Sequence, residues 1–273
     1  MKFDILIGNP PYNNSIDYRF ILLGFELNSD LMSMIHPARW KVADSLEAEQ
    51  IRERFIDNKK LSHISVFEAG HSGVTSIWPE TFIQSINFWL YHKDKSFNTL
   101  KVFTEMSNKN VRYSGNSVRK HKEEEFGFFI MNNIVLDIIK KQHEQAKTYN
   151  IAQRFELLQD SKVWIANSLQ AIYTEDNKTA DCRNIDIPIE EKRIYEMFVK
   201  TQFWRALTRQ CMSGFHSYNL KALKYITDLS NEDKLNIKNM INVEELENYL
   251  ENKFRLTSTE IDYLRNYGIT DSP

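Results

Sequence analysis

The tetrapeptide Asn9-Pro10-Pro11-Tyr12 follows directly after an apolar run of strand length, residues 2–8. Two consecutive prolines remove two backbone donors, so neither a strand nor a helix continues through them and the run ends in a rigid turn. The side-chain oxygen of Asn9 and the carbonyl oxygen of Pro10 can both accept hydrogen bonds from an amino group. Such acceptors would orient an amine whose lone pair is delocalised into a ring, such as adenine N6, and stabilise the charge that develops on methyl transfer.

Tyr12 adds a flat aromatic face on which a base swung out of a duplex can stack. The motif also has plainer interpretations, namely a rigid turn after a strand or a proline-rich ligand for another domain. Such ligands usually lie in disordered tails, whereas this motif stands at the carboxyl end of a strand, where open α/β sheets place their sites. The pattern therefore favours chemistry on an amine, with Pro11 stiffening the turn.

The elements that must position the motif predict an α/β sheet. They alternate as strand 2–8, helix 17–27, strand 31–36, helix 44–58 and strand 61–67. This alternation is typical of parallel crossovers. In the first helix Phe20, Leu23 and Leu27 share one apolar face. The stretch 82–92 is rich in Phe, Ile and Trp, and we expect a strand that closes the sheet as an antiparallel edge.

The alternation ends near residue 95, and the rest of the chain is predicted to be mainly helical. After a strand at 98–106, periodic apolar positions indicate helices at 128–146, 190–210, 243–251 and 258–266. The inward residues of the helix 190–210 are expected to be Ile194, Phe198, Phe203 and Leu207. The shift in composition predicts two regions, residues 1–100 and residues 101–273.

The overall composition is that of a globular chain without a strong bulk charge. Of its 273 residues, 42% are hydrophobic and 26% are charged, and no run of about 18 apolar residues suggests a membrane span. The net charge of −2 means that any contact with nucleic acid needs a local basic patch. The first residues do not resemble a signal peptide, and Cys182 and Cys211 are the only cysteines, which favours a cytoplasmic location.

The motif and several later segments resemble the adenine-N6 DNA methyltransferases of restriction-modification systems, especially the Eco57I/TaqI-like group, whose catalytic motif has the form Asn-Pro-Pro-Tyr. The similar segments are residues 18–20, 32–40, 51–55, 77–79, 85–90 and 254–263. The resemblance is strongest over residues 1–92. It implies that Asn9 and Pro10 orient the target adenine amine, that Tyr12 stacks on the extruded base, that S-adenosylmethionine is the methyl donor and that double-stranded DNA is the substrate.

The chain departs from this family at the cofactor site. In the family a glycine-rich Phe-x-Gly-x-Gly turn binds the methionine part of S-adenosylmethionine, but no two of the eight glycines here are separated by a single residue. The resemblance therefore implies an α/β fold with the C-terminal half of a Rossmann-like methyltransferase sheet, followed by a mixed, mainly helical target-recognition region. We expect this chain alone to bind the cofactor poorly and to need a complementing subunit or domain, and its cofactor-binding residues stay unassigned.

Other candidate residues have both functional and ordinary interpretations. Trp78 could form a second wall against a flipped adenine, or belong to the core. Between residues 192 and 224 seven basic residues stand against one acidic residue, with aromatic residues interleaved, which indicates either a DNA-contact patch or a solvated helix face. The DNA-binding candidates are Lys200, Arg205, Arg209, Lys221 and Lys224. The histidines lack a metal-ligand spacing, so no metal site is predicted.

The favoured interpretation is a site-specific DNA adenine-N6 methyltransferase, or the catalytic and DNA-recognition portion of one. Related Asn-Pro-Pro-Tyr sites methylate glutamine in proteins, so an enzyme acting on free bases or protein amides is an alternative. A second alternative is a catalytically incomplete fragment that retains only DNA or partner binding. The long region after residue 95 favours DNA, because recognition of a sequence needs an added surface.

Overall fold

In a computed structural model of the chain, the described residues are 3–67, 85–106, 111–118, 133–145, 150–156, 162–167, 169–210, 212–214, 217–218 and 220–267. The chain divides into two compact units. The first comprises residues 1–133 with 213–215, and the second comprises residues 134–212 with 216–273. Among the residues described, no helix is long and apolar enough to cross a membrane.

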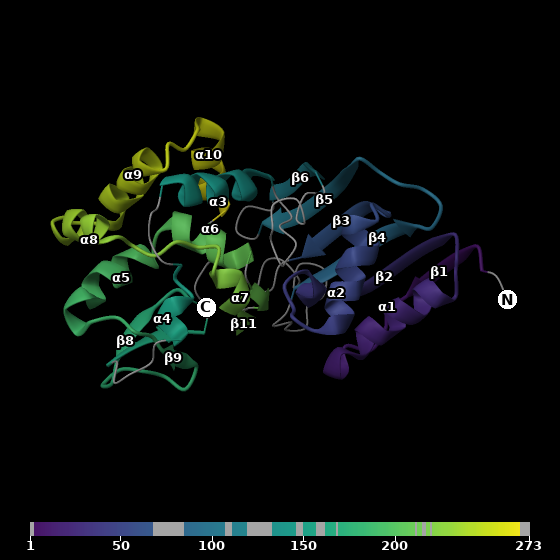
Figure 1. Cartoon of the computed structure of the whole chain (residues 1–273), viewed down its shortest axis with the longest axis horizontal. Coiled ribbons are helices and arrows are strands. Elements are labelled where there is room, and N and C mark those ends of the chain that lie inside the picture. The colour runs from purple at the N-terminus through teal and green to yellow at the C-terminus, as the bar shows by residue number, and fades with distance from the viewer. Residues whose placement is uncertain are drawn as a thin grey trace. The chain divides into compact units, whose positions relative to one another are not determined.

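The first unit is built around a six-stranded mixed sheet (Figure 1). Its elements are β1 (Ile5–Gly8), α1 (Ile16–Glu26), β2 (Leu31–Pro37), α2 (Leu46–Arg52), β3 (Leu61–Phe67), β4 (Ile86–His92), β5 (Thr99–Met106) and β6 (Val111–Val118). The strand order is β1-β2-β4-β3-β5-β6. Strands β1 and β2 are parallel, as are β3 and β5, whereas β4 runs antiparallel to both of its neighbours and β6 runs antiparallel to β5. The α/β class is confirmed.

The position of β4 corrects one prediction. We expected the segment 82–92 at an antiparallel edge, but β4 lies between β2 and β3. The continuous apolar run Phe88-Trp89-Leu90-Tyr91 suits a central strand, because both faces of a central strand pack against other residues. Since β2 and β3 both pair with β4, they point the same way without being neighbours.

Helices α1 and α2 pack against one face of this sheet (Figure 1). The predicted apolar face of the first helix is the wrong face, because Phe20 and Leu23 are 42% and 46% exposed. The inward face instead carries Ile21 and Gly24. A Cβ atom on Gly24 would lie 2.3 Å from the Met32 sulfur, so the glycine permits the close approach of α1 to the sheet. Hydrophobic periodicity could not detect a contact made by a residue without a side chain.

The second unit is mainly helical but also contains a small three-stranded sheet in the order β8-β7-β9. Its elements are α3 (Asn133–Gln145), α4 (Gln153–Glu156), β7 (Val163–Ala166), β8 (Ile172–Thr174), β9 (Cys182–Asn184), α5 (Lys192–Phe198), α6 (Gln202–Gln210), α7 (Leu220–Leu223), α8 (Asn231–Lys238), α9 (Val243–Lys253) and α10 (Ser258–Tyr267). A short pair, β10 (Met212–Gly214) and β11 (Ser217–Tyr218), forms a separate two-stranded sheet.

The predicted helix 190–210 is two helices, α5 and α6, separated at residues 199–201. The hydroxyl group of Thr201 accepts a hydrogen bond from the Trp204 amide at 3.0 Å and so caps the start of α6. The residues predicted to face inward are all buried, as expected: Ile194, Phe198, Phe203 and Leu207. The periodicity was therefore informative about burial even where the helix is interrupted.

The division between the units differs from the predicted boundary at residues 100/101. Strand β5 pairs with β3, and β6 pairs with β5, so both belong to the first sheet. The structural division falls between residues 133 and 134. The polar composition of residues 111–118 hid the strand β6, because strand propensity follows packing and not polarity alone.

Candidate active site

The Asn9-Pro10-Pro11-Tyr12 turn lies at the carboxyl end of β1. Gly8, the last residue of β1, pairs with Met34 in parallel register, so the turn leaves the sheet beside β2. Within the turn Pro10 is buried, Tyr12 is partly buried, and Asn9 and Pro11 are exposed. Tyr12 then starts a short 3-10 turn, residues 13–15, that leads into α1. The predicted placement of the motif after a strand of an α/β sheet is confirmed.

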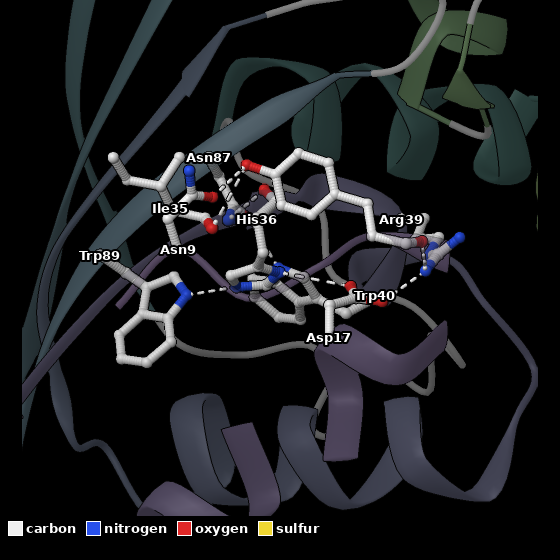
Figure 2. Close-up of polar contacts among 9 residues, drawn as sticks. Asn9, Asp17, Ile35, His36, Arg39, Trp40, Asn87 and Trp89 are labelled. Carbon is white, nitrogen blue, oxygen red and sulfur yellow. Dashed lines mark hydrogen bonds and ion pairs between the residues drawn. The ribbon is translucent and has the colours of Figure 1, made fainter. Parts of the chain in front are cut away.

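The side chains of Asn9 and Tyr12 contact each other directly. The Tyr12 hydroxyl donates to the Asn9 side-chain oxygen at 2.6 Å and lies 3.5 Å from the Ile35 carbonyl oxygen (Figure 2). Burial, and secondarily the negative charge of Asp17, raises the pKa of Tyr12, so its hydroxyl stays protonated and acts as a donor. The acceptor that the sequence assigns to an incoming amine is therefore occupied in this structure by a hydroxyl group of the same motif.

Arg39 and Asp17 form an ion pair next to the turn (Figure 2). Nη2 of Arg39 contacts Oδ1 of Asp17 and also donates to the backbone carbonyl of Tyr12 at 3.1 Å. The Asp17 side chain is fully buried and that of Arg39 is 23% exposed. Burial raises the pKa of Asp17, while the charge of Arg39 and its hydrogen bond act in the opposite direction. The two charges thus compensate each other in a desolvated position.

His36 of β2 lies next to Asp17, on the face of the sheet that packs against the helices. It is fully buried, and Nε1 of Trp89 donates to its Nε2 at 2.5 Å (Figure 2). Burial lowers the pKa of His36 to about 3, so the ring is neutral. Because Nε2 is the acceptor, Nδ1 carries the proton, and it lies 3.8 Å from Oδ2 of Asp17. The neutral Nδ1–H group of His36 therefore faces Oδ2 of Asp17, while Oδ1 of Asp17 contacts Arg39.

Further hydrogen bonds fix the short turn after β2 that carries Arg39. Nε1 of Trp40 donates to the Asn87 side-chain oxygen at 2.6 Å, and Nδ2 of Asn87 donates to the His36 carbonyl at 3.1 Å (Figure 2). Nη1 of Arg52 donates to the Trp40 carbonyl at 2.5 Å. All of these groups are buried or partly buried, so the position of Arg39 is set by hydrogen bonds from both β4 and α2.

Sequence reasoning missed the roles of Asp17 and Arg39. Both belong to segments already noted, since Asp17 opens the predicted helix and Arg39 lies in the stretch 32–40 that resembles the methyltransferase family. The available signal was a carboxylate in the first helical turn after the motif. Its partner is 22 residues away in the chain, and no local pattern connects them.

The histidines are held by ordinary hydrogen bonds where the structure describes them. His63 contacts the Ser65 hydroxyl at 2.8 Å, and His92 contacts the Ser62 hydroxyl at 3.0 Å. In the described part of the chain, no group of three or more histidine, cysteine or carboxylate side chains could hold a metal ion. Trp78, the predicted second wall of a base pocket, lies outside the described residues.

The predicted DNA-contact residues do not all lie on an exposed surface. Lys200 and Lys224 are exposed, and the ammonium group of Lys224 lies 4.8 Å from the centre of the Tyr225 ring. Arg205 is partly buried, and that burial lowers its pKa while the nearby Glu247 raises it. Arg209 is only 8% exposed, and the side chain of Lys221 is outside the described residues.

Arg209 is buried, and a buried side chain is not available to phosphate in this conformation, so its part in DNA binding stays a prediction. The local charge count also omitted α9, whose carboxylates Glu244, Glu247 and Glu251 line a cavity of about 310 Å³ together with Lys200. Glu247 accepts a hydrogen bond from the Gln202 amide at the start of α6. These carboxylates therefore lie beside Lys200, one of the candidates for DNA contact.

Comparisons with known proteins are consistent with the methyltransferase resemblance. No family model matches the chain. A protein described as an uncharacterised adenine-specific methylase of Mycoplasma pneumoniae is 32% identical over 79 residues, which cover 24% of this chain and 19% of that protein. The chain therefore matches about a fifth of the length of this relative.

Two solved structures match parts of the chain at low identity and low TM-score. The type I restriction-modification methyltransferase subunit of Streptococcus thermophilus is 15% identical with a TM-score of 0.30, covering 42% of this chain and 29% of that one. The type IIG restriction endonuclease BpuSI is 12% identical with a TM-score of 0.38, covering 93% of this chain and 48% of that one. The chain thus has a distant sequence similarity to an adenine-specific methylase, over about a quarter of its own length.

Proposed function

We propose that this chain is the catalytic and DNA-recognition portion of a site-specific DNA adenine-N6 methyltransferase. The observation that carries this proposal is the Asn9-Pro10-Pro11-Tyr12 turn at the carboxyl end of β1, held by the pairing of β1 with β2 and by a hydrogen bond from Arg39, in the turn after β2. Open α/β sheets bind their ligands at the carboxyl ends of strands. The similarity to an adenine-specific methylase supports the same chemistry.

In the proposed reaction, Asn9 and Pro10 accept hydrogen bonds from the two protons of the target amine. Pro11 limits the turn to few conformations, so the acceptors need little reorganisation when charge develops on the nitrogen. Because the Tyr12 hydroxyl now fills one of the two acceptor positions of the Asn9 oxygen, we expect the Tyr12 side chain to rotate away as the amine binds. That rotation frees the acceptor and makes the tyrosine ring available to stack on the extruded base.

The methyl donor is S-adenosylmethionine in this proposal, but the described residues do not fit its site. The turn after β1 carries prolines, and the sequence has no Gly-x-Gly turn whose amides could meet the cofactor. A complementing subunit or domain would supply it. On β1, which pairs only with β2 among the described strands, Ile5 and Ile7 are 59% and 78% exposed, and an exposed apolar edge strand of this kind is suited to receiving another strand.

Double-stranded DNA is the proposed substrate, and the second unit is the proposed recognition region. Its exposed lysines Lys200 and Lys224, with the partly buried Arg205, remain candidates for phosphate contacts. Lys221 remains a candidate from the sequence alone, as does Trp78 for stacking on the base.

Transfer of a labelled methyl group from S-adenosylmethionine to adenine in duplex DNA tests the proposal directly. The chain is assayed alone and with a glycine-rich cofactor-binding half from a related enzyme, using Asn9→Ala as the inactive control. We expect incorporation only with the added half. Incorporation that is equal in the wild type and Asn9→Ala would refute the assigned site.

Calorimetry separates the cofactor question from the catalytic one. We expect S-adenosylmethionine to bind the isolated chain weakly or not at all, because the cofactor turn is missing. A dissociation constant in the low micromolar range for the chain alone would contradict this part of the proposal. The second candidate, a catalytically incomplete binding fragment, is favoured by the same missing turn, and it predicts duplex binding without methyl transfer even when the cofactor-binding half is present.

A further inference from the structure

We infer that Arg39 is a positioning residue for the Asn9–Tyr12 turn, with Asp17 as its counter-ion. The guanidinium group holds the backbone carbonyl of Tyr12, and through it the orientation of the two side chains that would meet the base (Figure 2). The catalytic consequence of this inference rests on the proposed function. The structural consequence, a turn held in one conformation, does not.

A single nitrogen atom makes both of the important contacts. Nη2 of Arg39 bridges the Tyr12 carbonyl oxygen and Oδ1 of Asp17. Asp17 lies in the first turn of α1, so the guanidinium joins the end of the motif and the start of the helix to the turn that follows β2. At the other end of the motif, Gly8 is fixed by its pairing with Met34. The turn is therefore fastened on both sides.

The surroundings strengthen the contact to the Tyr12 carbonyl. The Asp17 side chain is fully buried, and Arg39 lies over the ring of Tyr18 at 5.2 Å from the ring centre. Hydrogen bonds from a charged donor are stronger than neutral ones, and low local polarity strengthens them further. Arg39 cannot move freely, since the neighbouring Trp40 is bound to Asn87 and Arg52.

Single substitutions would confuse positioning with folding, because they leave one buried charge without its partner. The double variant Asp17→Asn/Arg39→Met removes both charges at once and still deletes the donor to Tyr12. The second unit offers a matched control. There, Nε of Arg154 lies 2.7 Å from Oδ2 of Asp228 and its Nη1 donates to a backbone carbonyl at 3.0 Å, with side-chain exposures of 22% and 6%.

The first readout is amide hydrogen exchange of peptides that span residues 9–16, which needs no catalytic activity. We expect exchange in Asp17→Asn/Arg39→Met to be faster than in the wild type, on the order of tenfold, because a charge-assisted hydrogen bond is lost. The control Asp228→Asn/Arg154→Met should leave these peptides unchanged. Arg39→Lys should give an intermediate rate, since one ammonium nitrogen can in part replace the single bridging nitrogen.

The second readout is methyl transfer with a cofactor-binding half present. In Asp17→Asn/Arg39→Met we expect kcat to fall on the order of tenfold or more with KM for duplex DNA unchanged, because misplacing a reacting group costs rate more than binding. Arg39→Lys should recover part of kcat.

Unchanged exchange at residues 9–16 in the double variant would overturn the inference, whatever the activity. If the double variant shows faster exchange at residues 9–16 but keeps the wild-type kcat, the role of Arg39 in catalysis would be overturned. If the wild-type protein transfers no methyl group at all, the proposed function fails, and exchange alone then decides whether Arg39 holds the turn.

Discussion

Replacing Tyr12 by phenylalanine should strengthen binding of an extruded base. In the structure the Tyr12 hydroxyl donates to the Asn9 oxygen at 2.6 Å, at an exposed position. A neutral hydrogen bond of this kind is worth about 0.5–1.5 kcal/mol, so its removal should favour the state with a free Asn9 oxygen by roughly twofold to tenfold. The exposure of Asn9 places the expected effect nearer the lower value. Tyr12→Phe keeps the aromatic face for stacking.

The fluorescence of 2-aminopurine at the target position of a duplex measures this effect, because the signal rises when the base leaves the stack. The apparent affinity for the extruded state is compared between the wild type, Tyr12→Phe and Tyr12→Ala. We expect Tyr12→Ala to lose roughly 1–3 kcal/mol of stacking and to extrude the base poorly. Tyr249→Phe is a matched control, because it also removes a hydroxyl that donates to a side-chain oxygen at 2.6 Å, in the second unit.

The result that refutes this reasoning is equally specific. If Tyr12→Phe extrudes the base as poorly as Tyr12→Ala, the hydroxyl has a positive role in the bound state and does not block Asn9. If Tyr249→Phe gives the same gain as Tyr12→Phe, the change is a general consequence of losing a tyrosine hydroxyl group.

Three further predictions test other parts of the site. Asn9→Ala should lower kcat on the order of a hundredfold while the dissociation constant for duplex DNA, measured by fluorescence anisotropy, stays unchanged. Replacing Lys200 and Lys224 by glutamine should reduce the slope of log K for DNA binding against log salt concentration by up to about two, because each lost phosphate contact releases about one counter-ion fewer. Arg209→Gln should leave this slope unchanged, because Arg209 is buried. His36 has a pKa lowered to about 3, so the folded state binds fewer protons than the unfolded state below pH 6.5 and stability is lost as the pH falls. Between pH 7.5 and pH 5 the free energy of unfolding, measured by urea denaturation, should fall by about 2 kcal/mol. His36→Gln should remove this dependence on pH.

Much of the architecture around the motif could be predicted from local patterns. The strands at residues 31–37 and 61–67 follow from short apolar runs bounded by Pro37 and by polar residues. Asn9-Pro10-Pro11-Tyr12 was located because prolines end a strand unambiguously. These signals are local, so a single sequence carries them.

The errors arose where a local pattern has two solutions or where the deciding contact is distant. The central position of β4 depends on which strands it pairs with, and its apolar run is compatible with an edge or a centre. The inward face of α1 depends on Gly24, which contributes nothing to hydrophobic periodicity. The charge count around Arg209 ignored α9, which is distant in sequence but lies against α6 in the fold.

The same reasoning explains why the motif was found but its support was not. Asn9 and Tyr12 are three residues apart, so their chemistry can be read as a unit. Their supporting contacts join Tyr12 to Arg39, 27 residues away, and His36 to Trp89, 53 residues away. Two prolines already stiffen the turn, so only its two ends have to be held. Pairing of β1 with β2 holds the end at Gly8, and Arg39, ion-paired with Asp17 of α1, holds the end at Tyr12. The part of the site that performs chemistry is thus local in the chain, while the part that orients it depends on the tertiary fold.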